Sequence, residues 1–329
     1  MSRIQLAQGA GGEESQQLIR NLFIKHFSNP ILDEMDDAAI LECGPIAVST
    51  DTFTVTPLQF PGGDIGKLAI AGSLNDVAMR AAQPAYLTVG FVIEEGLEIA
   101  LLEQIVVSMS RELQVSGAQI VSGDTKIVPR GAVDGLLINT TAIGRVRGRC
   151  GVRQIESADQ LLLSGPVAEH GACIYAAREE IAISGLQSDC RTLWPAVAAL
   201  LEAGIPVHAM RDATRGGLAA VLNEWSEQRG RELWLEEAAV PLSAAVSGFA
   251  EILGIDPFSL ACEGAFVLAL PASASAPAIA ALQHAGHPQA ALIGRVGGVS
   301  SGPRVVLQSA YGTERLLEYP AGEILPRIC

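Results

Sequence analysis

The first half of the chain alternates short apolar runs with longer segments of helical periodicity. Leu101, Ile105 and Met109 recur at helical spacing within residues 97–115, and Gly117 follows just beyond them. Strands and helices therefore alternate, which indicates an α/β protein. The predicted strands cover residues 46–50, 86–93, 119–122 and 135–146, and the predicted helices cover residues 67–82 and 97–115.

A glycine- and arginine-rich stretch at residues 145–153 interrupts this pattern, and we place a domain boundary there. The alternation then resumes with a second α/β domain of similar size. Its predicted strands cover residues 160–164, 265–270 and 290–296, and its predicted helices cover residues 170–183, 191–203, 217–228 and 275–285. The resulting organisation is a domain at 1–150, a domain at 151–312 and a flexible tail at 313–329.

Composition narrows the class of protein. The 329 residues are enough for two domains with an extensive core, and 49% of them are hydrophobic. A net charge of -14 argues against nucleic-acid binding, because phosphate backbones require clustered Lys and Arg. Without an apolar run of membrane-spanning length or a signal peptide, we expect a cytoplasmic protein with no membrane partner.

The cysteines do not follow a metal-site spacing. None of the six forms a CxxC pair, so zinc and iron–sulfur centres lack support, and the internal ones are expected to act as small hydrophobes. Cys329, however, is the last residue, where a free thiol is prone to oxidation. From Pro320 an extended segment could carry this sulfur roughly 30 Å. A disordered end that happens to finish in cysteine is the alternative.

Acidic residues cluster beside small or hydroxylic ones. The predicted strands 46–50 and 119–122 stop at Asp51 and at Gly123-Asp124, and ligands of α/β sheets gather at such strand ends. Converging carboxylates repel one another unless cations neutralise them, and hard oxygen ligands suit Mg²⁺ bridged to phosphates. A single aspartate is more often a turn or cap residue, but the repetition favours a metal–phosphate site. The motifs are Asp36-Asp37-Ala38-Ala39, Ser49-Thr50-Asp51, Asn75-Asp76, Gly123-Asp124-Thr125-Lys126 and Arg211-Asp212-Ala213-Thr214-Arg215-Gly216-Gly217.

Two glycine-rich segments could supply donors for a phosphate. Gly9-Ala10-Gly11-Gly12 is a loop whose amides could approach an anion, and Thr214-Arg215-Gly216-Gly217 opens a predicted helix, where the dipole favours anions. The chain has no GxxxxGK[ST], which excludes a P-loop, and no GxGxxG after a strand, which argues against a Rossmann dinucleotide site.

These motifs closely resemble the HypE family of hydrogenase-maturation carbamoyl dehydratases, from Gln5 to Cys329. The aspartate motifs are shared with aminoimidazole ribonucleotide synthetase, selenophosphate synthetase and thiamine-monophosphate kinase, whereas the terminal Pro-Arg-Ile-Cys is specific to HypE within that group. The resemblance therefore favours a functional tail over a disordered end. The matching segments are Ser49-Thr50-Asp51, residues 60–69, Asn75-Asp76, Gly123-Asp124-Thr125-Lys126, residues 210–217 and Pro326-Arg327-Ile328-Cys329.

The resemblance implies an α/β (α+β) aminoimidazole ribonucleotide synthetase-like fold with two domains. Its N-terminal domain, at 1–150, would bind ATP and Mg²⁺ and form a homodimer whose strands build a barrel across the interface. A carbamoyl group would reach Cys329 from the carbamoyltransferase HypF. ATP would activate the carbamoyl oxygen, and loss of phosphate would leave an S-cyano group. The cyanide would pass to iron on the HypC–HypD complex and so to a [NiFe]-hydrogenase.

The resemblance also assigns roles to residues. Lys126 would stabilise the oxygen undergoing transfer, or alternatively form a surface ion pair. Glu263 falls where the family has its candidate base, and His170 is either a helix cap or a site residue. Two departures are Cys262-Glu263-Gly264-Ala265 in place of Asn-Glu-Gly-Lys, and Glu169 in place of Asp. The implied Mg²⁺ ligands are Asp37, Asp51, Asp76 and Asp124, and the implied nucleotide contacts also include Gly11, Gly12, Asn75, Gly123, Asp212 and Arg215.

Two other functions remain open from the sequence. Another ATP-using enzyme of the superfamily would make a small phosphorylated product and would not need Cys329. A non-catalytic carrier would accept a carbamoyl group on its tail without any further change on addition of ATP.

Overall fold

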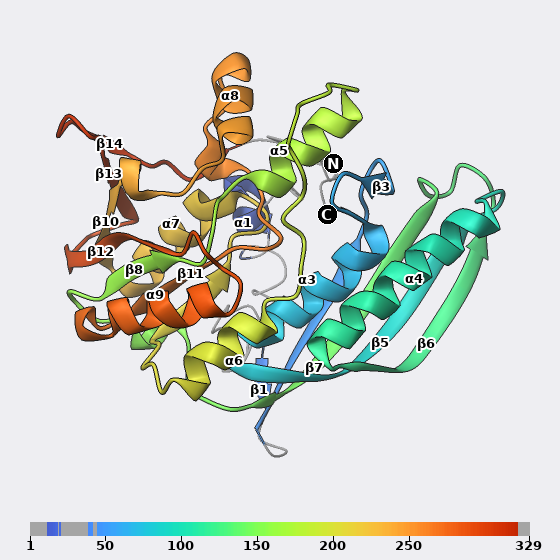
Figure 1. The fold of residues 1–329 in the computed structure, drawn as a ribbon, viewed down its shortest axis with the longest axis horizontal. Coiled ribbons are helices and arrows are strands. Elements are labelled where there is room, and N and C mark those ends of the chain that lie inside the picture. Colours follow the sequence, from blue (N-terminus) through green and yellow to red (C-terminus); the bar gives the residue numbers. More distant parts are fainter. Residues whose placement is uncertain (1–11, 19, 21–38, 42–44, 322–329) are drawn as a thin grey trace.

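The computed structural model describes residues 12–18, 20, 39–41 and 45–321. They form two α/β halves, with the N-terminal sheet on the right of Figure 1 and the larger C-terminal sheet on the left. Helix α3 (Ile65–Met79) lies between the halves. It packs on β2, β5 and β7 of its own sheet and contacts β9 and α6 of the other half.

The N-terminal half is a five-stranded sheet with α3 and α4 (Ile99–Ser116) on one face (Figure 1). A hairpin of β3 (Gln59–Phe60) and β4 (Gly63–Asp64) precedes α3, and Asp64 caps that helix by accepting the Lys67 amide. Gly117 ends α4 in the left-handed conformation, as its place after the periodic segment predicts. The strand order is β1 (Ala39–Leu41), β2 (Ile46–Phe53), β7 (Leu136–Val146), β5 (Ala82–Glu94) and β6 (Gln119–Val128).

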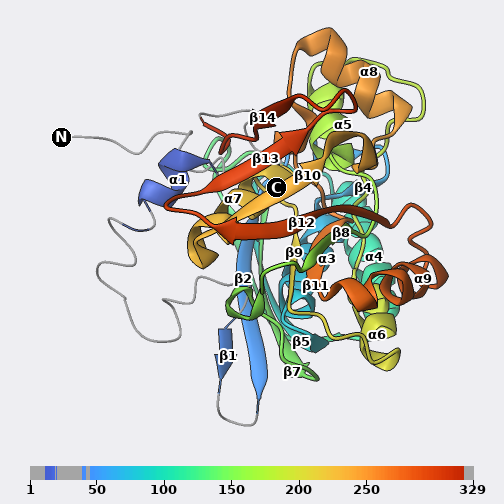
Figure 2. The same ribbon diagram turned by 90° about the vertical axis from the view of Figure 1, so that its left-hand side faces the viewer.

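The C-terminal half is a seven-stranded sheet that carries helices on its faces (Figure 2). Helix α1 (Glu13–Leu18) belongs to the N-terminal end of the chain but lies beside this half, near α7. The strand order is β14 (Glu314–Leu316), β13 (Arg304–Gln308), β10 (Arg231–Glu236), β12 (Ala291–Val299), β8 (Gln160–Leu163), β11 (Phe266–Leu270) and β9 (Ala209–Asp212). The helices are α5 (Glu169–Arg178), α6 (Trp194–Glu202), α7 (Gly217–Arg229), α8 (Ala244–Leu253) and α9 (Ser275–His284).

The structure corrects the predicted ends of two strands. Strands β2 and β6 do not stop at Asp51 and at Gly123-Asp124 but run on to Phe53 and Val128. Both strands continue because their backbone hydrogen bonding continues: β2 stays paired with β7 as far as Phe53, and β6 stays paired with β5 as far as Val128. Backbone pairing continues through polar residues, so a change in side-chain polarity does not mark the end of a strand.

Other boundaries shift by a few residues. The predicted helix at 67–82 ends at Met79, because Ala82 already starts β5, and the predicted helix at 170–183 ends at Arg178. Residues 314–316, within the predicted tail 313–329, form β14 and pair with β13. The sequence pattern missed two helices, α1 and α8, and seven strands, β1, β3, β4, β9, β10, β13 and β14.

The structure bears on two expectations from composition, which concern the internal cysteines and membrane-spanning segments. Cys150, Cys173, Cys190 and Cys262 are buried free thiols, as predicted for internal cysteines, whereas Cys43 and Cys329 lie outside the described residues. Over those same described ranges, no helix combines the length and the apolar character needed to cross a membrane.

Candidate active site

Four carboxyl groups line one small cavity between the two halves of the protein. Asp51 of β2 and Asp76 of α3 come from the N-terminal half, and Asp212 of β9 and Glu263 come from the C-terminal half. Phe53, Gly72, Thr214 and Arg215 complete the lining. A Cβ at residue 72 would stand 2.7 Å from the Phe53 ring, so a larger residue there would have to displace that ring. Residues that are far apart in sequence thus converge at the domain interface.

The two N-terminal aspartates are oriented by a reciprocal pair of hydrogen bonds between β2 and α3. Ser73 Oγ on the helix donates to Asp51 Oδ2 on the strand at 2.9 Å. Ser49 Oγ on the strand donates to Asp76 Oδ2 on the helix at 2.5 Å. Ser73 also lies 2.7 Å from Thr140 Oγ1 of the next strand, β7. Strand and helix therefore fix each other's carboxylates at the cavity wall.

Asp212 and Glu263 are buried acids that lie close to other carboxylates. Asp212 is 3% exposed, and its Oδ2 atom is buried without a hydrogen-bond partner. Burial raises the pKa of Asp212 to about 6, the charge of Arg211 opposes this rise, and the charge of Asp51 adds to it. Burial likewise raises the pKa of Glu263 well above its usual value, Asp212 and Asp189 raise it further, and Arg215 lowers it.

This donor set suits a hard divalent cation. The Asp212 Oδ2 atom is buried at the domain interface without a hydrogen-bond partner and shares its cavity with three other carboxyl groups, an arrangement that a bound cation would stabilise. Within the described part of the chain, however, no three His, Cys, Asp or Glu side chains already converge on one point as ligands. A Mg²⁺ ion bound here would therefore complete its coordination with water or with oxygens of a phosphate, as this ion usually does.

The loop that carries Glu263 is held by Asp189, a residue that the sequence motifs did not indicate. Asp189 Oδ1 accepts the Glu263 amide at 3.0 Å, and Oδ2 accepts the Gly264 amide at 2.9 Å. A Cβ at residue 264 would lie 1.8 Å from the Asp189 carbonyl oxygen, so only glycine fits there. Nothing around Asp189 in the sequence distinguishes it from an ordinary turn residue, and only the fold brings it to Glu263.

The structure gives Asn75 and His170 internal partners. Asn75 is fully buried: its Nδ2 donates to the Arg191 carbonyl at 3.0 Å and its Oδ1 accepts the Leu193 amide at 2.7 Å, so it joins the two halves. His170 is also fully buried, with Nδ1 2.8 Å from Ser188 Oγ and its ring edge on Phe60. Neither side chain lines the acidic cavity.

Gly123, Asp124 and Lys126 lie on β6 at the exposed edge of the N-terminal sheet, away from the cavity. Gly123 lies at the same height in the sheet as Asp51, because Asp51 pairs with Thr140 of β7. Thr140 pairs with Val89 of β5, and Val89 pairs with Gly123. Three strand spacings therefore separate Gly123 from Asp51 by about 14 Å.

Gly12 lies against the Pro320 carbonyl, whereas Gly11, Asp37 and Cys329 fall outside the described residues.

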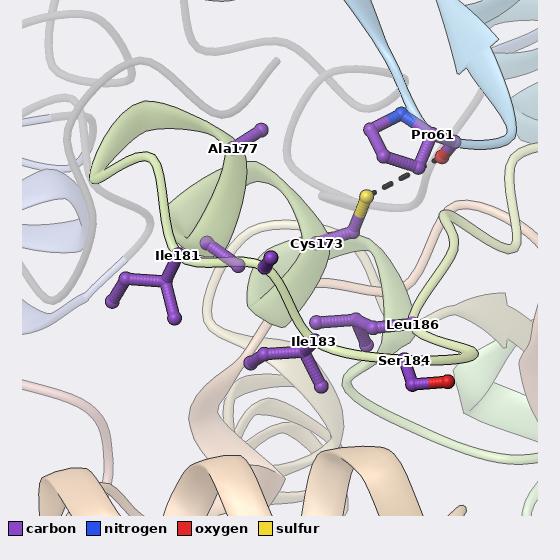
Figure 3. A pocket seen from close by; sticks show the side chains of 9 residues that line it. Pro61, Cys173, Ala177, Ile181, Ile183, Ser184 and Leu186 are labelled. Atoms are coloured by element: carbon purple, nitrogen blue, oxygen red, sulfur yellow. Dashed lines mark hydrogen bonds between the residues drawn. The ribbon is translucent and has the colours of Figure 1, made fainter.

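A larger pocket lies elsewhere and differs in chemistry (Figure 3). Its volume is about 410 Å³, and its wall is mostly apolar, formed by α5, the segment that follows it and Pro61. Cys173 Sγ donates to the Pro61 carbonyl at 3.3 Å, and burial raises the pKa of this thiol to about 11. With few polar groups and a protonated thiol, this pocket offers nothing for a phosphate or a cation.

Two family models match successive parts of the chain. The model of the AIR synthase related protein, N-terminal domain, matches residues 35–146, and that of the C-terminal domain matches residues 157–306. Carbamoyl dehydratase HypE of Escherichia coli (strain K12) is 44% identical over 340 residues, covering 100% of both chains. The protein belongs to the HypE family.

Solved HypE structures share the fold along the whole chain. A crystal structure of HypE in complex with ATP is 42% identical, covers 99% of this chain and 100% of its own, and has a TM-score of 0.83. A chain in the crystal structure of a HypE–HypF complex is 37% identical, covers 92% and 99%, and has a TM-score of 0.88. The predicted two-domain α/β fold of the HypE family is thereby confirmed.

Proposed function

We propose that the protein is an ATP-dependent carbamoyl dehydratase that converts an S-carbamoyl group on its own Cys329 to an S-cyano group. The observation that carries the proposal is the interdomain cluster of Asp51, Asp76, Asp212 and Glu263, with the unpartnered oxygen of Asp212. Full-length identity of 44% to carbamoyl dehydratase HypE, and the HypE structure that contains ATP, support it.

The reaction removes one oxygen and two protons from the carbamoyl group. The carbamoyl oxygen attacks the γ-phosphorus of ATP, ADP leaves, and the carbon then carries a phosphate in place of a poor leaving group. A base removes the nitrogen protons while the C–O bond to phosphate breaks, which leaves sulfur bonded to C≡N and releases inorganic phosphate. Atoms balance as carbamoyl plus ATP giving thiocyanate, ADP and phosphate.

The cavity residues fit these steps. Asp51, Asp76 and Asp212, with Asp37, would hold Mg²⁺, which supplies positive charge to the phosphates. Arg215, beside the start of α7, would contact the transferring phosphoryl group, where the helix dipole also favours anions. Glu263 would accept the nitrogen proton. Its raised pKa makes it a stronger base than an exposed carboxylate, and positive charge in the cavity would lower that pKa and favour the ionised form that accepts a proton.

The proposed partners follow from the thiol chemistry. HypF would load the carbamoyl group, a role consistent with the existence of a HypE–HypF complex. The HypC–HypD complex would take the cyanide for the iron of a [NiFe]-hydrogenase. Four buried free cysteines suit the reducing conditions of a cytoplasm.

A homodimer is part of the proposal. Strand β6 is the edge of its sheet, and all its residues but Val128 are exposed, including Val121 at 56% and Ile127 at 59%. An edge of this length with apolar side chains is a template for pairing with another strand. A second copy on this edge would cover it and would place Asp124 and Lys126 at the interface, which would give them a route to a shared site.

Replacing Ile127 by Glu is therefore expected to convert the protein from dimer to monomer at micromolar concentration. Light scattering coupled to size exclusion measures this, and Ile252→Glu, an 85% exposed position on α8, is the matched control that should remain dimeric. An unchanged mass for the Ile127 variant would remove β6 from the interface.

The function itself is tested by intact mass spectrometry. The protein is incubated with HypF and carbamoyl phosphate, and ATP with Mg²⁺ is then added. The proposal requires a gain of one carbamoyl group followed by loss of one water. A carbamoyl group that stays unchanged on addition of ATP would identify a carrier, and ATP turnover with no mass change at all would indicate a small-molecule enzyme of the same superfamily.

Asp189→Asn is expected to slow the dehydration about tenfold and to lower stability by about 1–2 kcal/mol. The amide NH₂ would face one of the two backbone N–H groups that the carboxylate now accepts, so the Glu263 loop would lose a hydrogen bond. Single-turnover mass spectrometry and thermal unfolding measure the two effects. Asp256→Asn is the control: Asp256 also caps a backbone amide, at Phe258, so it should cost stability without changing the rate.

A further inference from the structure

The segment that leads into the C-terminal residues is held at three points. The Leu317 carbonyl accepts Asn223 Nδ2 at 2.9 Å, and the Tyr319 hydroxyl donates to Glu224 Oε1 at 2.7 Å. The Pro320 carbonyl accepts the amide of Glu13 at 3.1 Å. Two of these contacts come from α7 and one from α1. The described chain therefore ends in an anchored segment, residues 317–321, which we call the tail root.

Glu224 is the centre of this arrangement. Its side chain is buried, and it accepts Gln16 Nε2 at 3.0 Å as well as the Tyr319 hydroxyl, both on Oε1. Its other oxygen forms an ion pair with Arg211. Burial and the negative charge of Glu224 raise the pKa of Tyr319, so the phenol stays protonated and remains a donor. A buried carboxylate with this many donors, one of them charged, holds its geometry firmly.

The N-terminal segment packs closely against the tail root. A Cβ at residue 12 would stand 2.2 Å from the Pro320 carbonyl oxygen, so only glycine allows the Glu13 amide to reach it. Arg20 secures the other end of the segment with two hydrogen bonds of 2.9 Å to Glu227 of α7. The segment thus lies across the tail root and is bound to α7 through Gln16 and Arg20.

The contacts of Glu224 also extend to the acidic cavity. Arg211, the ion-pair partner of Glu224, directly precedes Asp212 in β9, and its charge opposes the rise in the pKa of Asp212. Helix α7, which carries Glu224, starts at Gly217, just after the cavity residues Thr214 and Arg215. Strand β9 and helix α7 therefore connect the tail root to one wall of the cavity.

We propose that Glu224, Tyr319, residues 12–18 and Arg20 form a clamp that fixes the start of the segment carrying Cys329, so that Glu224 and Tyr319 are positioning residues for the tail reaction. The proposal rests on the proposed function. The eight residues after Ala321 can span about 28 Å at most, whereas release from Leu317 onward would lengthen the arm to thirteen residues and about 45 Å. A longer arm lowers the effective concentration of the Cys329 thiol at the cavity, by about twofold for this change in length.

The clamp predicts the behaviour of Tyr319→Phe, which removes only one hydroxyl. Hydrogen exchange at the Glu13 amide and in residues 317–321 should become about tenfold faster, because a hydrogen bond to a charged acceptor is lost. Single-turnover dehydration of the loaded protein should slow at least twofold. Loading by HypF and the affinity for ATP should not fall, since neither depends on where the arm begins. Tyr311→Phe, at a 95% exposed tyrosine, is the matched control and should change none of these.

The outcomes separate the clamp from the function. Equal exchange in the Tyr319 variant and in the unmodified protein would overturn the clamp, whatever the activity. Faster exchange with an unchanged dehydration rate, or with loading slowed to the same extent, would overturn the positioning role. Absence of dehydration in the unmodified protein would defeat the proposed function, while the exchange measurement would still decide whether the clamp exists.

Discussion

Replacing Cys329 by alanine is expected to abolish both the gain of a carbamoyl group and its ATP-dependent dehydration. The proposed reaction needs a sulfur that can reach two active sites in turn, and Cys150, Cys173, Cys190 and Cys262 are all buried. Burial raises the pKa of Cys190 and Cys262 well above the usual value, so these thiols are also poor nucleophiles. Intact mass after incubation with HypF, carbamoyl phosphate and ATP–Mg²⁺ measures the loss.

Two control variants make this result specific. Cys150→Ala removes a buried thiol, and Cys43→Ser removes the cysteine that, like Cys329, lies outside the described residues. Both should load and dehydrate like the unmodified protein. A carbamoyl adduct that persists in the Cys329 variant, or one that disappears in the Cys43 variant, would place the chemistry on another sulfur.

Asp212→Asn is expected to reduce dehydration about a hundredfold or more while leaving carbamoyl loading intact. The variant removes the charge of the carboxylate whose Oδ2 atom is buried without a partner at the domain interface, so a cation and the phosphates it bridges would lose a ligand. Asp51→Asn should act in the same way from the other wall of the cavity. Single-turnover mass spectrometry of protein loaded beforehand separates the two steps.

The same substitution is expected to stabilise the protein when no ligand is present. The folded-state pKa of Asp212 is about 6, above its ordinary value of 3.8, so the ionised carboxylate opposes folding above pH 6 and ceases to do so as the pH falls towards 4. This shift corresponds to at most roughly 2–3 kcal/mol. The Tm of the Asn variant should therefore exceed that of the unmodified protein at pH 7.5, and the difference should shrink at lower pH.

Asp134→Asn is the matched control for both measurements, because Asp134 is exposed and lies outside the cavity. This variant should have nearly the same dehydration rate and Tm as the unmodified protein. Full dehydration activity in the Asp212 variant would exclude this carboxylate from the cation site, and a lower Tm at pH 7.5 would mean that the carboxylate is not destabilising in the folded protein.

Hydrophobic periodicity predicted most of the elements that bury a continuous face. Helix α4, with Gly117 at its end, and β7 follow directly from their patterns. Strand β10 was missed because its sequence, Arg-Glu-Leu-Trp-Leu-Glu, places charged residues at both ends and gives too short an apolar run. Strands β9 and β14 are only four and three residues long and are defined by their neighbours in the sheet rather than by their own composition.

The candidate site was predicted in part. The motifs containing Asp51, Asp76, Asp212 and Arg215, and the residue Glu263, meet in one cavity, although Asp51 lies within a strand rather than at its end. Asp189 could not be found, because its role depends on two backbone amides that are more than seventy residues away. Register places Asp124 and Lys126 on the far edge of the sheet, and periodicity along one strand carries no information about strand order.

The contacts of α1 also set an order for biosynthesis. Residues 12–20 leave the ribosome early, but their partners Glu224, Glu227 and Pro320 are made far later, the last of them nine residues before Cys329. Domains generally fold as they emerge, from the N-terminal side. The first helix must instead wait for the rest of the chain. Its docking therefore marks a polypeptide that has been translated to Pro320 or beyond, within nine codons of the thiol it would carry.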